Sequence, residues 1–317
     1  MAIALGFLSA LVLVLRRPGY TWWEGRPRLP AGLSFLTSPV YGWSMRVFLG
    51  PAGIPTAAEE RTTAGGLLTL SKLGLNAMEI EFVRSIYLTR SNAEAVGELA
   101  GQLGIQLTVH APYFINLLSE KRETVEASKK RILESLDRAE AMNAEAVVVH
   151  SAYYGKLKRE EAFEEMKDIS YELLDGAESL GVKVKLAYET MAKESQFAGL
   201  EELLRLVEVV KSDRLTVCVD FAHIFVRNKG RISYPEVLDK LRGLGHVYSH
   251  FSNMRYNPKT RRFMDIHEPI DGYPPFRPLA EEILRRKMDI TIISESPILE
   301  VDSLKMKGLL QELGYEP

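Results

Sequence analysis

Histidines and carboxylates recur at the ends of short β-branched runs, where their types and positions suit metal binding. The chain has six histidines and one cysteine, so a metal site would use histidine, aspartate and glutamate rather than a set of thiolates. Nine such residues stand at or soon after predicted strand ends: His110, His150, Glu189, Asp220, His223, His250, Asp265, His267 and Glu295. Zinc and manganese take these ligand types. Since one ion usually takes three or four protein ligands, nine residues indicate two or three ions.

The runs that carry these residues predict the scaffold. Eight strands are predicted, at residues 45–49, 77–81, 105–110, 146–150, 182–189, 215–220, 246–250 and 289–295. Amphipathic helical patterns lie between them, for example at 124–142 and 159–180. Eight such units are typical of a (β/α)8 TIM barrel, whose active site lies at the carboxyl ends of the strands. A doubly wound open sheet is the alternative, but it would more often show a glycine-rich phosphate loop than GPAGIP (50–55).

The first 44 residues differ from the rest. Residues 1–15 are an apolar run, shorter than the roughly 20 residues that a transmembrane helix needs. No regular period follows before Met45. We therefore expect 1–44 to be an N-terminal extension or a mis-assigned start, with a membrane anchor through 1–15 less favoured. We expect 45–317 to form one catalytic TIM-barrel domain.

Composition restricts the function classes. The chain has 317 residues, 46% of them hydrophobic, and a formal net charge of -2, so it is not a strongly basic nucleic-acid-binding tail. A single cysteine excludes a disulfide framework. No secretory signal pattern is visible, so a cytoplasmic, nucleoid-associated location is expected.

Several segments resemble endonuclease IV, the abasic-site DNA repair nuclease among the xylose isomerase-like TIM barrels, and archaeal-type members most. They are HAPYFINL (110–117), VVVHSAYYG (147–155), YET (188–190), VCVDFAH (217–223), SHFSN (249–253), DIH (265–267) and SES (294–296). The resemblance implies a zinc-dependent enzyme of base excision repair. It would hydrolyse the phosphodiester 5′ to an abasic site in double-stranded DNA, without an obligate protein partner and as a monomer.

The resemblance also implies how the nine residues divide among three zinc ions, with manganese as another candidate metal. The first ion would be held by His110, His150 and Glu189. The second would share Glu189 and add Asp220, His250 and Glu295. The third would be held by His223, Asp265 and His267. Glu189 and Glu295 are the expected catalytic residues, because Glu189 would bridge two ions and Glu295 could orient the attacking water.

Other residues on the same loops are candidates for DNA contact. Tyr113 stands where the family places an aromatic side chain that inserts beside the lesion. Arg227, Lys229, Arg261 and Arg262 follow metal-bearing strands, where a basic rim would suit phosphate contacts. Ordinary core packing of Tyr113, or solvated loop charge for the others, is the simpler alternative.

The sequence also departs from the family. The family's His-Pro-Gly after the fourth strand is His150-Ser151-Ala152 here, and Glu268-Pro269-Ile270 replaces a glycine-rich segment. GPAGIP replaces the first-strand motif that contains histidine in bacterial members. No ligand is lost, but two of these changes affect DNA-facing loops.

Two other functions remain open. A sugar isomerase or epimerase of the same superfold needs only one ion, which Glu189, Asp220, His250 and Glu295 could hold. Among the other ligands, His110, His150 and the Asp265/His267 pair argue against it, because a single-ion enzyme does not require them. A non-enzymatic DNA-binding or structural barrel would not need the complete set of nine.

Overall fold

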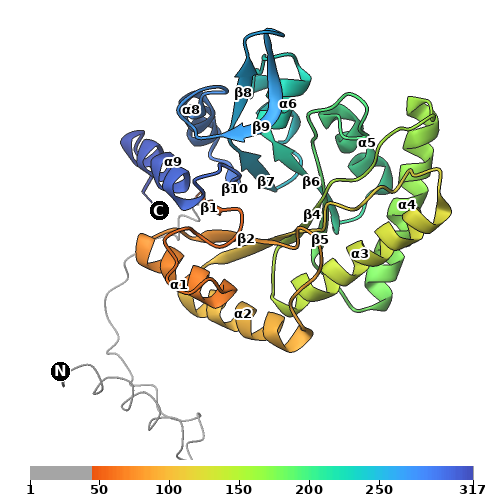
Figure 1. Cartoon of the computed structure of the whole chain (residues 1–317), viewed down its shortest axis with the longest axis horizontal. Helices are drawn as coiled ribbons and strands as arrows, with labels where there is room; N and C mark the ends of the chain where they lie inside the picture. Colours follow the sequence, from red (N-terminus) through yellow and green to blue (C-terminus); the bar gives the residue numbers. More distant parts are fainter. Residues whose placement is uncertain (1–44, 317) are drawn as a thin grey trace, which may run out of the picture. The chain divides into compact units, whose positions relative to one another are not determined.

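Eight parallel strands form a nearly closed barrel with helices between them in the computed structural model, which describes residues 45–316 (Figure 1). The strands pair in the order β1-β10-β7-β6-β5-β4-β3-β2. Their bounds are β1 (Val47–Pro51), β2 (Ala77–Glu81), β3 (Gln106–His110), β4 (Ala146–Val149), β5 (Lys185–Glu189), β6 (Leu215–Asp220), β7 (His246–Phe251) and β10 (Asp289–Ser294). Each overlaps one predicted strand. The predicted TIM barrel is therefore confirmed, whereas the expected N-terminal extension lies outside the described residues.

Helices follow the strands and cover the outside of the barrel (Figure 1). They are α1 (Thr63–Leu73), α2 (Arg90–Leu103), α3 (Arg122–Ala141), α4 (Arg159–Ser179), α5 (Leu200–Val210), α6 (Phe221–Arg227), α7 (Tyr234–Lys240), α8 (Phe276–Arg286) and α9 (Glu300–Glu312). Local residues set several ends. Thr62 caps α1 by accepting a hydrogen bond from the Gly65 N–H, and Gly104 ends α2 in the left-handed conformation. Among residues 45–316, no helix is long and apolar enough to cross a membrane.

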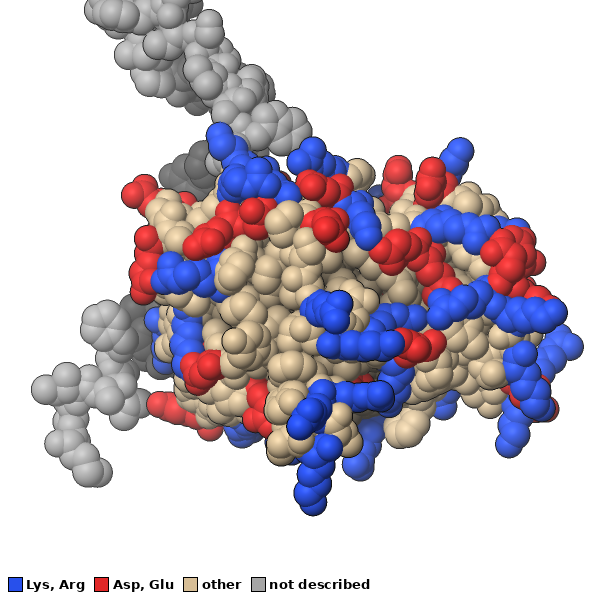
Figure 2. Space-filling view, turned by 90° about the horizontal axis from the view of Figure 1, so that it is seen from above, with Lys and Arg blue, Asp and Glu red and all other residues tan. Residues whose placement is uncertain are grey.

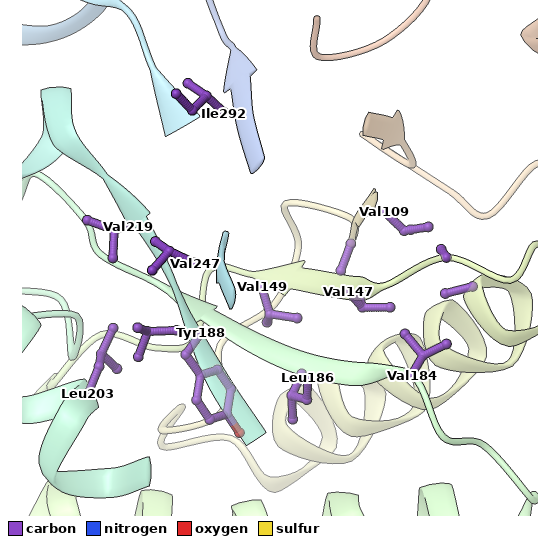
Figure 3. Packing of buried hydrophobic residues seen from close by; sticks show 14 of the residues in the cluster. Val109, Val147, Val149, Val184, Leu186, Tyr188, Leu203, Val219, Val247 and Ile292 are labelled. Carbon is purple, nitrogen blue, oxygen red and sulfur yellow. The ribbon is translucent and has the colours of Figure 1, made fainter. Parts of the chain in front are cut away.

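Alternation along the strands separates two apolar layers. Val147 and Val149 of β4 point outward and pack with residues such as Leu186 between the strands and the helices (Figure 3). The residue between them, Val148, belongs to a second cluster with Ala146, Ala187, Cys218 and Tyr248. Because successive strand side chains point to opposite faces, this second cluster fills the inside of the barrel.

A β-hairpin leaves the barrel after β7. Its strands, β8 (Asn253–Asn257) and β9 (Arg262–Glu268), pair antiparallel and lie beside α6 (Figure 1). Phe263 packs on Phe225 of α6 with ring centroids 4.6 Å apart. The eight strands predicted from the sequence do not include these two. The hairpin matters for the site because β9 carries Asp265 and His267.

The barrel closes between β1 and β2 with few main-chain bonds. Asn76 replaces part of the ladder: its side chain accepts from the Leu49 N–H at 2.7 Å and donates to the Val47 carbonyl at 3.1 Å. The Gly53 N–H bonds the Glu79 carbonyl at 2.9 Å. Between these bonds the two strands approach so closely that a Cβ on Gly50 would lie 1.7 Å from the Ala77 carbonyl oxygen. Only glycine fits at this position.

We therefore predict that Gly50→Ala destabilises the protein by about 3 kcal/mol, the upper part of the usual overpacking range, because the clash is with backbone rather than with a movable side chain. Urea unfolding followed by circular dichroism measures the change. Gly101→Ala in α2 is the matched control, since a Cβ there meets nothing within 4 Å and alanine favours a helix. Equal unfolding midpoints for Gly50→Ala and wild type would contradict the closure described here.

Candidate metal centre

Six of the nine candidate ligands lie at the carboxyl ends of the barrel strands, and the other three lie on α6 and β9. His110, Glu189 and Asp220 are the last residues of β3, β5 and β6, and His150 and Glu295 directly follow β4 and β10. Alternation directs these side chains inward. Glu189, for example, is two residues beyond Ala187 of the interior cluster, so both side chains point to the same face. The strand ends thus bring residues that are far apart in the sequence to one mouth of the barrel.

The nine residues fall into three groups whose potential ligand atoms lie within 4.8 Å of one another. The groups are His110, His150 and Glu189; Glu189, Asp220, His250 and Glu295; and His223, Asp265 and His267. These are the groups that the family resemblance implies. Glu189 belongs to two of them, which gives its carboxylate a bridging position.

Glu189 is fully buried, and histidine nitrogens surround both of its carboxylate oxygens. Oε2 lies 2.8 Å from His150 Nε2 and 3.3 Å from His110 Nε2. Oε1 lies 3.1 Å from His223 Nδ1 and 3.4 Å from His250 Nδ1. Burial alone would raise the pKa of Glu189, but the charges of His150 and His250 hold that pKa well below its usual range.

Asp220 links two of the groups through local helix chemistry. It is the N-cap of α6, and its Oδ1 accepts a hydrogen bond from the His223 N–H at 2.6 Å. This bond places His223 in the first turn of the helix, above the strand end. From there His223 Nε2 reaches Asp265 Oδ1 on β9 at 3.2 Å. His267, on the same strand of the hairpin, is oriented by a 2.7 Å bond between its Nδ1 and Ser252 Oγ.

The field of the site attracts cations. Burial lowers the pKa of His110, but the nearby carboxylates of Glu81 and Glu189 outweigh burial and raise it to about 10. Burial, partly offset by His250, raises the pKa of Glu295 well above its usual range. The carboxylates of Glu189, Asp220 and Glu295 lie close together and are largely shielded from water. A group of closely spaced buried carboxylates is stabilised by positive charge.

The donor set fits divalent transition metal ions. Each group supplies three or four imidazole and carboxylate ligands, as zinc or manganese sites do. Two oxygens in the second group, Asp220 Oδ2 and Glu295 Oε2, are buried and accept no hydrogen bond among the described residues. Buried polar atoms without partners are rare, so these two oxygens are suited to a cation.

The candidate DNA-binding residues occupy different surroundings. Tyr113 is half exposed at the barrel mouth, and its ring stacks on His150 with centroids 5.5 Å apart. Lys229, Arg261 and Arg262 are exposed. Figure 2 shows the molecule from above, which is the side on which the hairpin lies in Figure 1. Lys and Arg side chains gather in the middle of this face.

Arg227 is partly buried, and its guanidinium donates hydrogen bonds to the carbonyls of Met191, Lys193 and Gln196. It therefore fastens the loop between β5 and α5. The predicted contact of Arg227 with DNA stays a prediction.

Two acidic residues near the site are absent from the sequence prediction. Glu79 and Glu81 lie on β2, and Glu79 is fully buried. Glu81 is the register partner of His110, and burial raises the pKa of Glu81 to about 7. The pattern of two glutamates at alternate positions of an otherwise apolar strand, AMEIE, could have revealed them.

Comparisons with known proteins agree with this fold. A family model for the xylose isomerase-like TIM barrel matches residues 67–311. An uncharacterised protein of Methanocaldococcus jannaschii is 30% identical over 284 residues, covering 84% of this chain and 98% of the relative. A protein of Oceanobacillus iheyensis named probable endonuclease 4 is 30% identical over 244 residues, covering 71% of this chain and 80% of the relative.

Solved structures share the fold. A D-tagatose 3-epimerase-like protein superposes with a TM-score of 0.64 at 23% identity, covering 83% of this chain and 96% of that chain. Endonuclease IV from Thermus thermophilus superposes with a TM-score of 0.59 at 23% identity, and the match covers 83% of this chain and 99% of that chain. Together with the family model and the curated relatives, these matches show that the chain belongs to the xylose isomerase-like TIM-barrel family and is a homologue of endonuclease 4 proteins.

Proposed function

We propose that this protein is a zinc-dependent abasic-site endonuclease that cleaves the DNA phosphodiester 5′ to the lesion. The observation that carries the proposal is the grouping of nine ligands into three sets, two of which share Glu189. The similarity to a probable endonuclease 4 over 80% of that relative's length supports it. We further propose that residues 45–317 carry the activity and that the protein acts as a monomer.

The reaction breaks a P–O bond: water attacks phosphorus, and the 3′ oxygen leaves and is protonated to a 3′-hydroxyl. Bound zinc ions would supply the Lewis acidity that lowers the pKa of water to about 7 and neutralises charge on the phosphate and the leaving oxygen. Glu189 belongs to two of the ligand groups, so its carboxylate would serve both of them. Glu295, whose side chain is only 14% exposed, belongs to the same group as Asp220 and would orient the attacking water.

Substrate contacts would come from the loops that surround this centre. Tyr113 projects from the loop after β3 next to two ligands, His110 and His150, where an aromatic ring can stack in a gap in the duplex. Exposed Lys229, Arg261 and Arg262 are suited to phosphate contacts. Recognition would thus combine one aromatic side chain that inserts into the duplex with several charged contacts to phosphate, which do not depend on the DNA sequence.

A single-ion sugar epimerase is the second candidate. Several structural neighbours are epimerases, including the D-tagatose 3-epimerase-like protein, and one four-ligand group could serve such a reaction. This function leaves His110, His150, Asp265 and His267 without a task. We therefore favour the nuclease.

The two candidates predict different products. Zinc-loaded protein should cleave a duplex that contains one abasic site, leave a 3′-hydroxyl 5′ to the lesion, and leave a panel of ketoses unchanged. Binding to the duplex should weaken steeply as salt rises, because phosphate contacts release counterions. The same duplex with an intact nucleotide is the control. Epimerised ketose together with uncut DNA would overturn the proposal in favour of the epimerase.

Glu189→Gln should reduce kcat for abasic-site cleavage by much more than tenfold while the barrel stays folded. The reason is that one carboxylate serves two ligand groups, so its charge is lost from both. Glu140→Gln is a suitable control, since Glu140 accepts hydrogen bonds from the Lys183 and Val184 N–H groups, before β5 begins. A Glu189→Gln variant with more than a tenth of wild-type kcat would contradict the bridging role, since that loss is only about 1.4 kcal/mol.

A further inference from the structure

Glu79 lies beside the metal centre but belongs to none of its three ligand groups. It stands in the middle of β2, its side chain is fully buried, and no lysine or arginine contact is found for it among residues 45–316. A buried carboxylate is costly unless polar or charged groups surround it. Its actual partners therefore indicate what it does.

Those partners are a threonine and a metal-ligand candidate. Glu79 Oε2 accepts a hydrogen bond from Thr108 Oγ1 at 2.8 Å, and Thr108 is its register partner on β3. Glu79 Oε1 lies 2.9 Å from His250 Nε2. Both Glu79 Oε1 and His250 Nε2 are buried and have no hydrogen-bond partner in the described part of the chain, so each is available to the other. The barrel register thus directs one carboxylate oxygen at one imidazole nitrogen.

The opposite nitrogen of His250 faces the ligand group. Its Nδ1 lies 3.3 Å from Glu295 Oε1 and 3.4 Å from Glu189 Oε1. A histidine that binds a metal through Nδ1 carries its proton on Nε2, and that N–H needs an acceptor where water is excluded. Glu79 is the group in position to accept it.

The acceptor at His250 differs in charge from the one at His110. His110 Nε2 lies toward Glu189, and its other ring nitrogen, Nδ1, lies 2.8 Å from the Ala111 carbonyl. That carbonyl is neutral, whereas Glu79 carries a carboxylate. A charged acceptor makes the imidazole a stronger metal donor than a neutral one does.

We propose that Glu79 is a positioning residue for the metal ion of the Glu189, Asp220, His250 and Glu295 group: it fixes His250 with Nδ1 toward the ion and strengthens that nitrogen as a ligand. The inference rests on the metal dependence of the proposed function but not on the nature of the substrate. The same four ligands would hold the ion of a nuclease or of an epimerase.

Zinc affinity tests this role directly, with three variants at the contact. Competition with a chromophoric chelator measures affinity, and mass spectrometry after gel filtration against the chelator measures the number of ions retained. Glu79→Ala should lower the affinity for one zinc ion by about 10- to 100-fold, which is the usual effect of removing the hydrogen-bond partner of a metal-binding side chain. That variant should retain one ion fewer than wild type. Glu79→Gln, whose amide oxygen can still accept from Nε2, should restore part of the affinity, and Thr108→Val should cause a smaller loss than Glu79→Ala.

Glu300→Gln is the matched control. Glu300 is also a buried glutamate, but it accepts hydrogen bonds from Thr56 and Ala57 and lies outside the three ligand groups. This variant should keep the wild-type affinity and number of ions. Thermal unfolding of each metal-free variant shows whether the barrel has folded, and Glu79→Gln and Thr108→Val serve if Glu79→Ala does not fold.

Two results would overturn the inference: zinc affinity within twofold of wild type in the folded Glu79 variants, or an equal loss in Glu300→Gln. Either result would leave abasic-site cleavage by the wild-type protein unaffected. Conversely, weakened zinc binding in Glu79→Ala with no DNA cleavage by wild type would support the positioning role and count against the nuclease.

Discussion

The buried carboxylate of Glu189 is the constraint on which the barrel mouth depends. A fully buried negative charge is stable only when both of its oxygens have positive or hydrogen-donating partners. Four histidines provide them, and they come from the ends of β3 and β7, from the residue after β4 and from the first turn of α6. The mouth can hold this arrangement only if the strands converge in one register.

Several features of the scaffold serve that convergence. Strand alternation turns the terminal side chains inward, and Gly50 lets β1 and β2 come close enough to close the barrel. Asp220 ends β6 and caps α6, so the same residue contributes a candidate ligand and fixes the position of another, His223. The fold and the metal centre therefore share residues, and a change at one of them affects both.

Much of this arrangement could be predicted from the sequence because its signals are local. Strand runs that end in histidine or a carboxylate predict both the barrel and its functional end. The hairpin could not be predicted in the same way: β8 and β9 are rich in polar residues, and they are held by packing such as Phe263 on Phe225. The backbone partners of Arg227 could not be predicted either, because they lie more than thirty residues away in the sequence. Glu79 was not predicted because it lies inside its strand rather than at the strand end, although an acidic residue in an apolar strand is itself a signal.

We propose that the three ligand groups, two of which share Glu189, hold three ions in one chain. Metal content measured by plasma mass spectrometry on the purified protein, after exchange into buffer with a low concentration of free zinc, tests it most directly. We predict three zinc ions per chain. A single ion per chain would contradict this proposal and would favour a single-ion enzyme.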